Sequence, residues 1–341
     1  MKVLLTGSRG YIGSVLAAML TSRGHEVKGL DCDLYRRCTF IGCVPAVPTA
    51  LKDVRDTEVE DVWDADAVIH LAALSNDPLG DYRPELTREI NACASIRLAE
   101  IAKKAGVRRF LYASSCSVYG AAGDRLIDET AALNPVTPYG LSKAEVEREL
   151  RGMADDSFTP TYMRPATAYG VSPRLRFDLV ANNLTAWAYT TSRVYLKSDG
   201  SAWRPIAHVE DIARAFTAVL EAPRRLVHNQ SFNVGNSADN YRIRRIAEMV
   251  EETVPGSRVE YANDADTDTR NYRVNCAKIA RMLPEAAPHW NARKGIRQLY
   301  EIYGTTGLTL EAFEGPQFKR IAHVLGLIRE GFLDENLRWK I

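Results

Sequence analysis

The sequence predicts a doubly wound α/β fold, in which a parallel sheet carries helices on both of its faces. Short apolar segments alternate with helical segments through the first half of the chain, and this alternation is typical of such sheets. The strand segments are apolar at almost every position, as expected where both faces of a strand are buried. A glycine-rich segment directly follows the first of them.

The elements can be placed in order along the chain. We expect strands at 2–7, 25–31, 67–73 and 108–115, and helices at 14–24 and 84–106. Segment 32–50 holds three cysteines and two prolines, which predicts a loop. Beyond about Tyr169 the alternation is looser, with a helix at 179–192, a short strand at 194–198 and a turn at Asp199 and Gly200.

These patterns predict two closely packed domains. The first spans 1–170, with later returns of the chain near 206–235, and the second is a smaller mixed α/β domain over 171–341. From Leu308 onward the pattern predicts an amphipathic helical tail. We expect this tail to cap the second domain or to contact a neighbouring subunit.

Composition excludes several classes of function. The chain has 341 residues, 44 Lys and Arg against 43 Asp and Glu, and six cysteines. This balance does not favour nucleic acid or an anionic membrane as a partner. The cysteines form no Cys-x-x-Cys pair and have no histidine at metal-ligand spacing, so we expect free thiols and no metal. Without a leader before the strand at Lys2 or a long apolar run, we expect a cytoplasmic protein.

The glycine-rich segment "LLTGSRGYIGS" places Gly7, Gly10 and Gly13 between a strand and a helix, with Tyr11 and Ile12 among them. Glycines there permit a tight turn and a close approach of the backbone to a pyrophosphate, which the helix N-terminus then holds. The motif predicts a dinucleotide-binding (Rossmann) domain. The alternative, a glycine-rich turn without a ligand, is weaker in this strand-to-helix context.

Asp31 ends the second expected strand, where a carboxylate can accept hydrogen bonds from the adenosine ribose. This position favours NAD over NADP. Arg36 and Arg37 follow closely and offer an alternative site for a 2′-phosphate, although solvated loop charges are the more ordinary interpretation.

Tyr139 and Lys143 in "TPYGLSKAEVERE" form a Tyr-x-x-x-Lys pair on an expected helix. Residues four apart lie on one face of a helix. A nearby ammonium group lowers the pKa of a phenol, which makes the tyrosine a usable base at neutral pH. The pair alone also fits an ordinary helix contact, but beside the phosphate loop it indicates catalysis.

The phosphate loop, the ribose acid, "SSCSVYG" and "YGLSK" occur in an order that resembles the extended short-chain dehydrogenase/reductase family, in its nucleotide-sugar-modifying branch. The resemblance spans nearly the whole chain. It implies that Ser115 binds the reacting hydroxyl, Tyr139 is the general base, and Lys143 binds the nicotinamide ribose. The implied NAD-binding residues are Gly7, Gly10, Tyr11, Ile12, Gly13, Asp31, Asp53, Val54, Leu71, Ala72, Ala73, Ser75, Tyr139 and Lys143.

The resemblance also implies a nucleotide-diphosphate sugar as substrate and a homodimer. Arg204 matches a diphosphate-binding arginine, and Arg270 resembles a second one, with Arg273 as the alternative. Thr167 stands where the family commonly has an asparagine. The implied substrate-binding residues are Ser115, Ser117, Thr167, Arg204 and Arg270.

Residues absent from the motif narrow the reaction. The 4,6-dehydratases of the family carry an Asp-Glu pair before Val-Tyr-Gly, and decarboxylases carry a Glu at the position of Ser117. Epimerases acting at C3 and C5 have a cysteine there, whereas Cys116 is displaced by one residue and is expected to be a buried thiol. Helix residue Asn91 fits a structural role at least as well as a catalytic one.

The sequence therefore predicts an NAD-dependent nucleotide-sugar epimerase that acts at C4 through a 4-keto intermediate. An NAD(P)H-dependent 4-ketoreductase is the alternative, and a non-catalytic NAD-binding regulatory protein is a further one. The intact set Ser115, Tyr139 and Lys143 argues against a non-catalytic protein.

Overall fold

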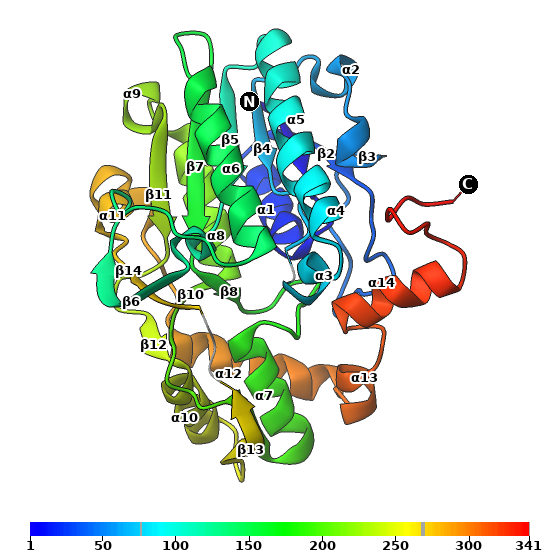
Figure 1. Ribbon diagram of the computed structural model, residues 1–341, viewed down its shortest axis with the longest axis vertical. Helices are drawn as coiled ribbons and strands as arrows, with labels where there is room; N and C mark the ends of the chain where they lie inside the picture. Colours follow the sequence, from blue (N-terminus) through cyan, green and yellow to red (C-terminus); the bar gives the residue numbers. More distant parts are fainter. Residues whose placement is uncertain (76, 267–269, 341) are drawn as a thin grey trace.

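The computed structural model describes residues 1–75, 77–266 and 270–340 (Figure 1). The strands are β1 (Lys2–Thr6), β2 (Glu26–Asp31), β3 (Thr49–Leu51), β4 (Ala67–His70), β5 (Arg109–Ala113), β6 (Ala121–Ile127), β7 (Thr159–Pro165), β8 (Thr167–Tyr169), β9 (Arg193–Ser198), β10 (Trp203–His208), β11 (Gln230–Val234), β12 (Asn240–Arg242), β13 (Arg258–Asp266) and β14 (Asn271–Val274). The helices are α1 (Tyr11–Ser22), α2 (Val59–Val62), α3 (Asp77–Tyr82), α4 (Pro84–Arg88), α5 (Ala94–Lys104), α6 (Pro138–Met153), α7 (Val180–Thr191), α8 (Val209–Glu221), α9 (Arg224–Val227), α10 (Ile243–Thr253), α11 (Ala277–Met282), α12 (Ala292–Thr306), α13 (Leu310–Glu314) and α14 (Arg320–Arg329).

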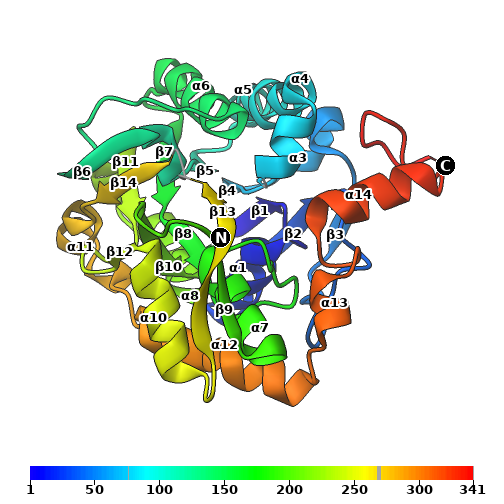
Figure 2. The same ribbon diagram turned by 60° about the horizontal axis from the view of Figure 1, so that its bottom comes forward.

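A seven-stranded parallel sheet in the order β11-β7-β5-β4-β1-β2-β3 confirms the predicted fold class. Helices α3 to α6 cover one face, and α1 and α8 cover the other (Figure 2). The strand order reverses between β1 and β4, where the chain crosses from one side of the sheet to the other. Ligands bind at such a switch point in open α/β sheets.

Alternate side chains of each central strand enter opposite hydrophobic cores, which explains why these strands are apolar throughout. Leu4 and Val68 pack in the core beneath α5 and α6, whereas their neighbours Leu5 and Ile69 pack in the core beneath α1 and α8. All four are at most 3 % exposed. Both faces of the central strands are therefore buried, as expected for a parallel sheet with helices on each side.

The lower part of the molecule in Figure 1 holds α7, α10 and α12, with the small sheet β12-β10-β8 and the parallel pair β13-β9. A third hydrophobic core joins these elements. Tyr11, at the start of α1, belongs to this core, and its hydroxyl donates to the Gly170 carbonyl at 2.7 Å. This contact fixes the lower part against the phosphate loop.

The C-terminal tail differs from its prediction in two respects. Gly315 and Pro316 divide it into α13 and α14, because proline cannot continue a helix interior. Phe313 of α13 packs in the third core, but Val324 and Leu327 of α14 pack in the core beneath α5 and α6. The tail therefore bridges the two parts of the molecule (Figure 1).

A short strand, β3, lies at the end of the predicted loop 32–50 and forms the edge of the large sheet. Among the described residues, no helix has both the length and the apolar character needed to span a bilayer.

Candidate active site

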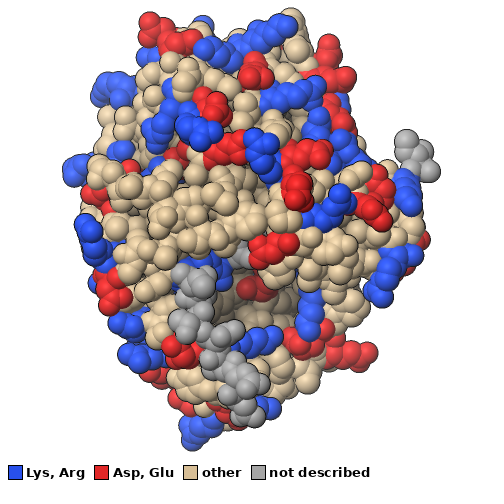
Figure 3. Space-filling view, viewed as in Figure 1, with Lys and Arg blue, Asp and Glu red and all other residues tan. Residues whose placement is uncertain are grey.

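One cavity of about 780 Å³ lies between the large sheet and the lower part of the molecule. Figure 3 shows a hollow in this region, on a face where positive and negative side chains are interspersed. The structure brings all the predicted site residues to this cavity, including both the cofactor and the substrate sets. They are Gly7, Gly10, Tyr11, Ile12, Gly13, Asp31, Asp53, Val54, Leu71, Ala72, Ala73, Ser75, Ser115, Ser117, Tyr139, Lys143, Thr167, Arg204 and Arg270.

The phosphate loop turns tightly between β1 and α1. Gly7 has a φ of +69°, which favours glycine, and a Cβ on Gly13 would lie 1.9 Å from the Gly7 carbonyl oxygen. The glycines let the loop pack tightly against the start of α1 and the backbone at Ala72, where the helix N-terminus can hold an anion. The loop therefore fits the pyrophosphate of a dinucleotide.

Asp31 lies at the end of β2 with both carboxylate oxygens hydrogen-bonded. They accept from the backbone N–H groups of Arg9 at 2.8 Å and Asp33 at 2.7 Å. Burial raises the pKa of Asp31, and these two bonds oppose the rise. Asp33 itself is paired with Arg9 and Arg174, so two carboxylates border the expected ribose position.

Asp53 caps the short helical turn that contains Val54 and forms a bidentate ion pair with Arg55. The loop 71–75 forms another wall and is held by Asn91, whose side-chain oxygen accepts from the Leu74 N–H at 2.7 Å. The side-chain N–H of Asn91 also donates to the Leu74 carbonyl at 3.0 Å. The structure thus gives Asn91 a positioning role.

Ser115 lies one residue beyond Ser114, which follows β5, and caps the helical turn Cys116–Tyr119. Its hydroxyl oxygen accepts from the Ser117 N–H at 3.1 Å. Cys116 is fully buried, and its thiol donates to the Arg164 carbonyl. It therefore points away from the cavity, as expected from its displacement by one residue.

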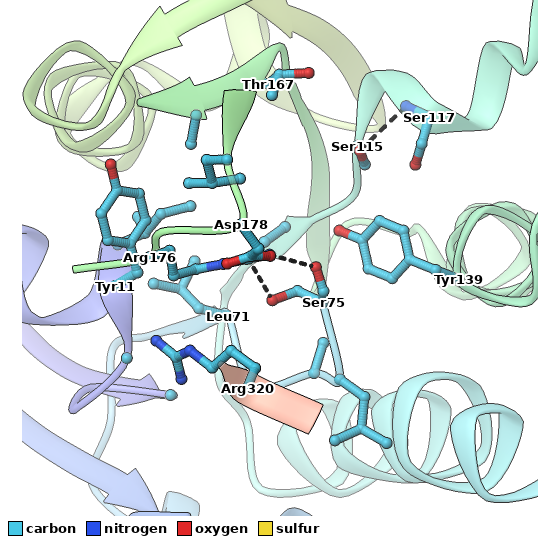
Figure 4. A pocket seen from close by; sticks show the side chains of 18 of the residues that line it. Tyr11, Leu71, Ser75, Ser115, Ser117, Tyr139, Thr167, Arg176, Asp178 and Arg320 are labelled. Atoms are coloured by element: carbon cyan, nitrogen blue, oxygen red, sulfur yellow. Dashed lines mark hydrogen bonds and ion pairs between the residues drawn. The ribbon is translucent and has the colours of Figure 1, made fainter. Parts of the chain in front are cut away.

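Tyr139 and Lys143 lie one turn apart near the start of α6, where Thr137 caps the helix and Pro138 begins it. Figure 4 shows Tyr139 pointing from α6 into the cavity, on the side where Ser115 and Ser117 lie. The Lys143 ammonium nitrogen lies 5.5 Å from the centre of the Tyr139 ring and donates to the Ala113 carbonyl at 2.7 Å. Burial lowers the pKa of Lys143 to about 7.

A buried ion pair lies next to Lys143, one helical turn farther along α6. Glu147, one turn after Lys143, accepts from the Ser114 hydroxyl at 2.6 Å and from two guanidinium nitrogens of Arg164. The side chains of Glu147 and Arg164 are 1 % and 2 % exposed. This pair joins α6 to β7 and to the end of β5.

Thr167 from β8 and Arg204 from β10 line the part of the cavity that the sequence predicts to bind substrate. Arg204 is 4 % exposed, and its guanidinium carbon lies 5.7 Å from the centre of the Tyr272 ring. Arg270 lines the cavity, whereas the alternative Arg273 packs over the Trp203 ring instead.

Sequence reasoning missed eight charged residues that line the cavity: Arg9, Asp33, Lys52, Asp81, Arg176, Asp178, Lys197 and Arg320. Arg176 pairs with Asp178 at 2.5 Å and donates to the Ser75 hydroxyl at 3.0 Å (Figure 4). The segment "SPRLRFD" carries Arg176 just after the chain enters the lower part, but nothing local in the sequence marks Arg320.

Arg36 and Arg37, the alternative 2′-phosphate ligands, lie against the C-terminal residues. Arg36 stacks on Trp339 at 3.9 Å, and Arg37 pairs with Glu330 at 2.8 Å. Among the residues that the structure describes, no group of three or more His, Cys, Asp or Glu side chains is arranged to hold a metal ion.

Comparisons with known proteins agree with this geometry. The chain is 27 % identical over 335 residues to UDP-glucose 4-epimerase of Bacillus subtilis (strain 168), covering 88 % of this chain and 94 % of the relative. It is 30 % identical over 252 residues to UDP-glucose 4-epimerase of Mycolicibacterium smegmatis, covering 70 % and 78 %.

Among solved structures, MoeE5 in complex with UDP-glucuronic acid and NAD matches with a TM-score of 0.78 and 25 % identity, covering 90 % of this chain and 100 % of MoeE5. The NAD-dependent NDP-hexosamine 5,6-dehydratase TunA shares the fold, with a TM-score of 0.79, 24 % identity, and 89 % and 98 % covered. A family model matches residues 3–235. The chain belongs to the NAD dependent epimerase/dehydratase family, and its cofactor is NAD.

Proposed function

We propose that this protein epimerises a nucleotide-diphosphate sugar at C4 through a 4-keto intermediate. The observation that carries the proposal is the composition of the cavity wall around Tyr139. The hydroxyls of Ser115 and Ser117 lie beside it, Lys143 lies behind it, and no carboxylate is present on the turn 115–119. Elimination of water needs an acid and a base in addition to the tyrosine, whereas transfer of a hydride at a carbinol does not.

In the proposed mechanism, Ser115 donates a hydrogen bond to the C4 oxygen and so holds it near Tyr139. Tyr139, as phenolate, removes the proton from the C4 hydroxyl and later returns it. Lys143 stabilises the phenolate when it carries its proton, because an opposite charge nearby favours the ionised form. Bound NAD would supply the acceptor and donor of the C4 hydride, and the cavity residues named above would hold it.

Arg204 and Arg270 are proposed to bind the substrate diphosphate, since guanidinium groups suit paired hydrogen bonds to phosphate oxygens. Thr167 offers a hydroxyl where the family commonly has an amide. Uridine is the first base to test, because UDP-glucose 4-epimerases are among the relatives. In this scheme residues 1–170 mainly serve the cofactor, and 171–341 mainly serve the sugar nucleotide.

The test is incubation of the purified protein with UDP-, dTDP-, GDP- and CDP-activated sugars, with products read by NMR and the NADH absorbance band followed in parallel. We expect interconversion of two C4 epimers and no net change in absorbance, because each cycle returns the hydride. Stoichiometric loss of NADH or NADPH with a keto sugar, without epimer interconversion, would replace the epimerase by a ketoreductase.

A further inference from the structure

Arg320, the first residue of α14, reaches into the NAD cavity from the C-terminal segment 320–339. The residue is 6 % exposed, and its guanidinium carbon lies 3.6 Å above the centre of the Tyr35 ring. One guanidinium nitrogen donates to the Arg174 carbonyl at 3.4 Å. Figure 4 shows Arg320 and Arg176 entering the same part of the cavity from different sides.

Arg320 differs from the other buried arginines around it in its lack of a counter-ion. Arg174 pairs with Asp33 at 2.9 Å, and Arg176 pairs with Asp178 at 2.5 Å. Across the residues that the structure describes, Arg320 forms no such ion pair with a carboxylate. Burial lowers the pKa of Arg320; Tyr35 and Asp178 oppose the shift, while the charge of Arg176 adds to it.

A buried guanidinium group without an anion is unfavourable. Leaving a buried charge uncompensated is costly, and a stacked aromatic ring returns only part of that cost. Arginine stays protonated in proteins, so this group cannot escape the cost by losing its proton. An anionic ligand in the cavity would supply the missing partner.

We propose that Arg320 binds the diphosphate of NAD, and that the C-terminal segment 320–339 is therefore part of the cofactor site. The phosphate loop lines the same cavity and supplies backbone N–H groups, while Arg320 supplies a positive charge without a paired carboxylate among the described residues. The proposal depends on the NAD site of the family and not on C4 chemistry.

The remainder of the segment is held by hydrogen bonds beside Asp31 and Asp53, where the adenosine of NAD is expected. Trp339 donates to the Cys32 carbonyl at 2.6 Å, and Arg55 donates to the Asn336 carbonyl at 2.8 Å. Leu337 lines the cavity between these contacts. The segment thus lies against the residues that follow β2 and forms part of the cavity wall there.

The experiment compares Arg320→Met with Arg329→Met after removal of bound nucleotide. Methionine keeps the length and packing of the side chain but not its charge, and Arg329 is an exposed residue on the same helix. Dissociation constants are measured by calorimetry for NAD, ADP-ribose, NADP and adenosine. Circular dichroism and the melting temperature verify that both variants are folded.

We expect Arg320→Met to weaken the binding of NAD and ADP-ribose about 10- to 100-fold, which is the range expected for loss of a charge-assisted hydrogen bond. The dissociation constant of adenosine should change less than about twofold. Arg320→Lys should recover part of the loss, and Arg329→Met should match the unaltered protein. Equal losses for adenosine, a loss confined to NADP, or no loss at all would each overturn the proposal. These binding constants require no sugar, so a failed epimerase assay leaves the test intact.

Discussion

Two walls of the cavity are built in different ways: the catalytic wall, formed by Ser115, Tyr139 and Lys143, and the arginine-lined wall, formed by Arg176, Arg204 and Arg320. Ser115, Tyr139 and Lys143 lie within one short stretch of chain, and each is fixed by a strand end or a helix start. The cavity arginines instead come from distant segments, with Arg176 following β8, Arg204 in β10 and Arg320 at the start of α14. The proposed reacting groups are thus placed by local structure, whereas the proposed anion-binding charges are brought together by the packing of distant segments.

The largest expected effect tests the catalytic wall. Tyr139→Phe removes the proton acceptor but little contact area, so kcat should fall about 10²- to 10⁴-fold. Affinity for NAD and for the sugar nucleotide should change less than about threefold. Steady-state kinetics and calorimetry measure both, and retention of most activity would remove Tyr139 from the role of base.

The next prediction concerns the buried Glu147–Arg164 ion pair, which lies next to Lys143 of the catalytic wall. Glu147→Gln leaves the buried Arg164 without its carboxylate, which should reduce the free energy of unfolding by about 3–5 kcal/mol. Glu248→Gln is the matched control, because Glu248 pairs with Arg245 on an exposed face of α10. Its cost should be about 0.5 kcal/mol. Urea unfolding compares the two, and similar losses would show that burial of the first pair does not matter.

Arg204→Met tests the arginine-lined wall. Loss of a guanidinium that binds phosphate should weaken the affinity for the sugar nucleotide about 10- to 100-fold. The affinity for NAD should stay within about twofold of its original value. Arg242→Met serves as the control, since Arg242 stacks on the Trp203 ring at 4.9 Å in the neighbouring strand. If Arg204→Met changed kcat alone, the separation between the two walls would be wrong.

The smallest effect is a pH dependence of the NAD-free protein. Lys143 has a pKa of about 7 when folded, against an ordinary value of 10.5, because burial disfavours its charge. Between these values the unfolded chain binds the extra proton, so stability should rise with pH. We expect Lys143 to contribute a rise of about 1–3 kcal/mol between pH 7 and 9.5. Urea unfolding of Lys143→Met should show a correspondingly flatter profile, and equal slopes would contradict the shift.

The same division explains what the sequence could and could not predict. Glycine spacing, strand ends and the Tyr-x-x-x-Lys pair are local signals, so the large sheet and every predicted site residue reached the expected cavity. Arg36 and Arg37 were candidates only because they follow Asp31 along the chain, and they pack against Trp339 and Glu330 instead. Arg320 was missed because its role depends on the path of the tail, which no periodicity encodes.

The position of Arg320 near the C-terminal end also sets an order of events during synthesis. The phosphate loop leaves the ribosome about 300 residues before Arg320, an interval of about 15–60 s at ordinary rates of elongation. Throughout that interval one wall of the cavity, formed by Arg320 and Leu337, has not yet been made. A nascent chain that has not reached Arg320 therefore lacks this wall, and we expect it to bind the nucleotide more weakly than a chain that includes this segment.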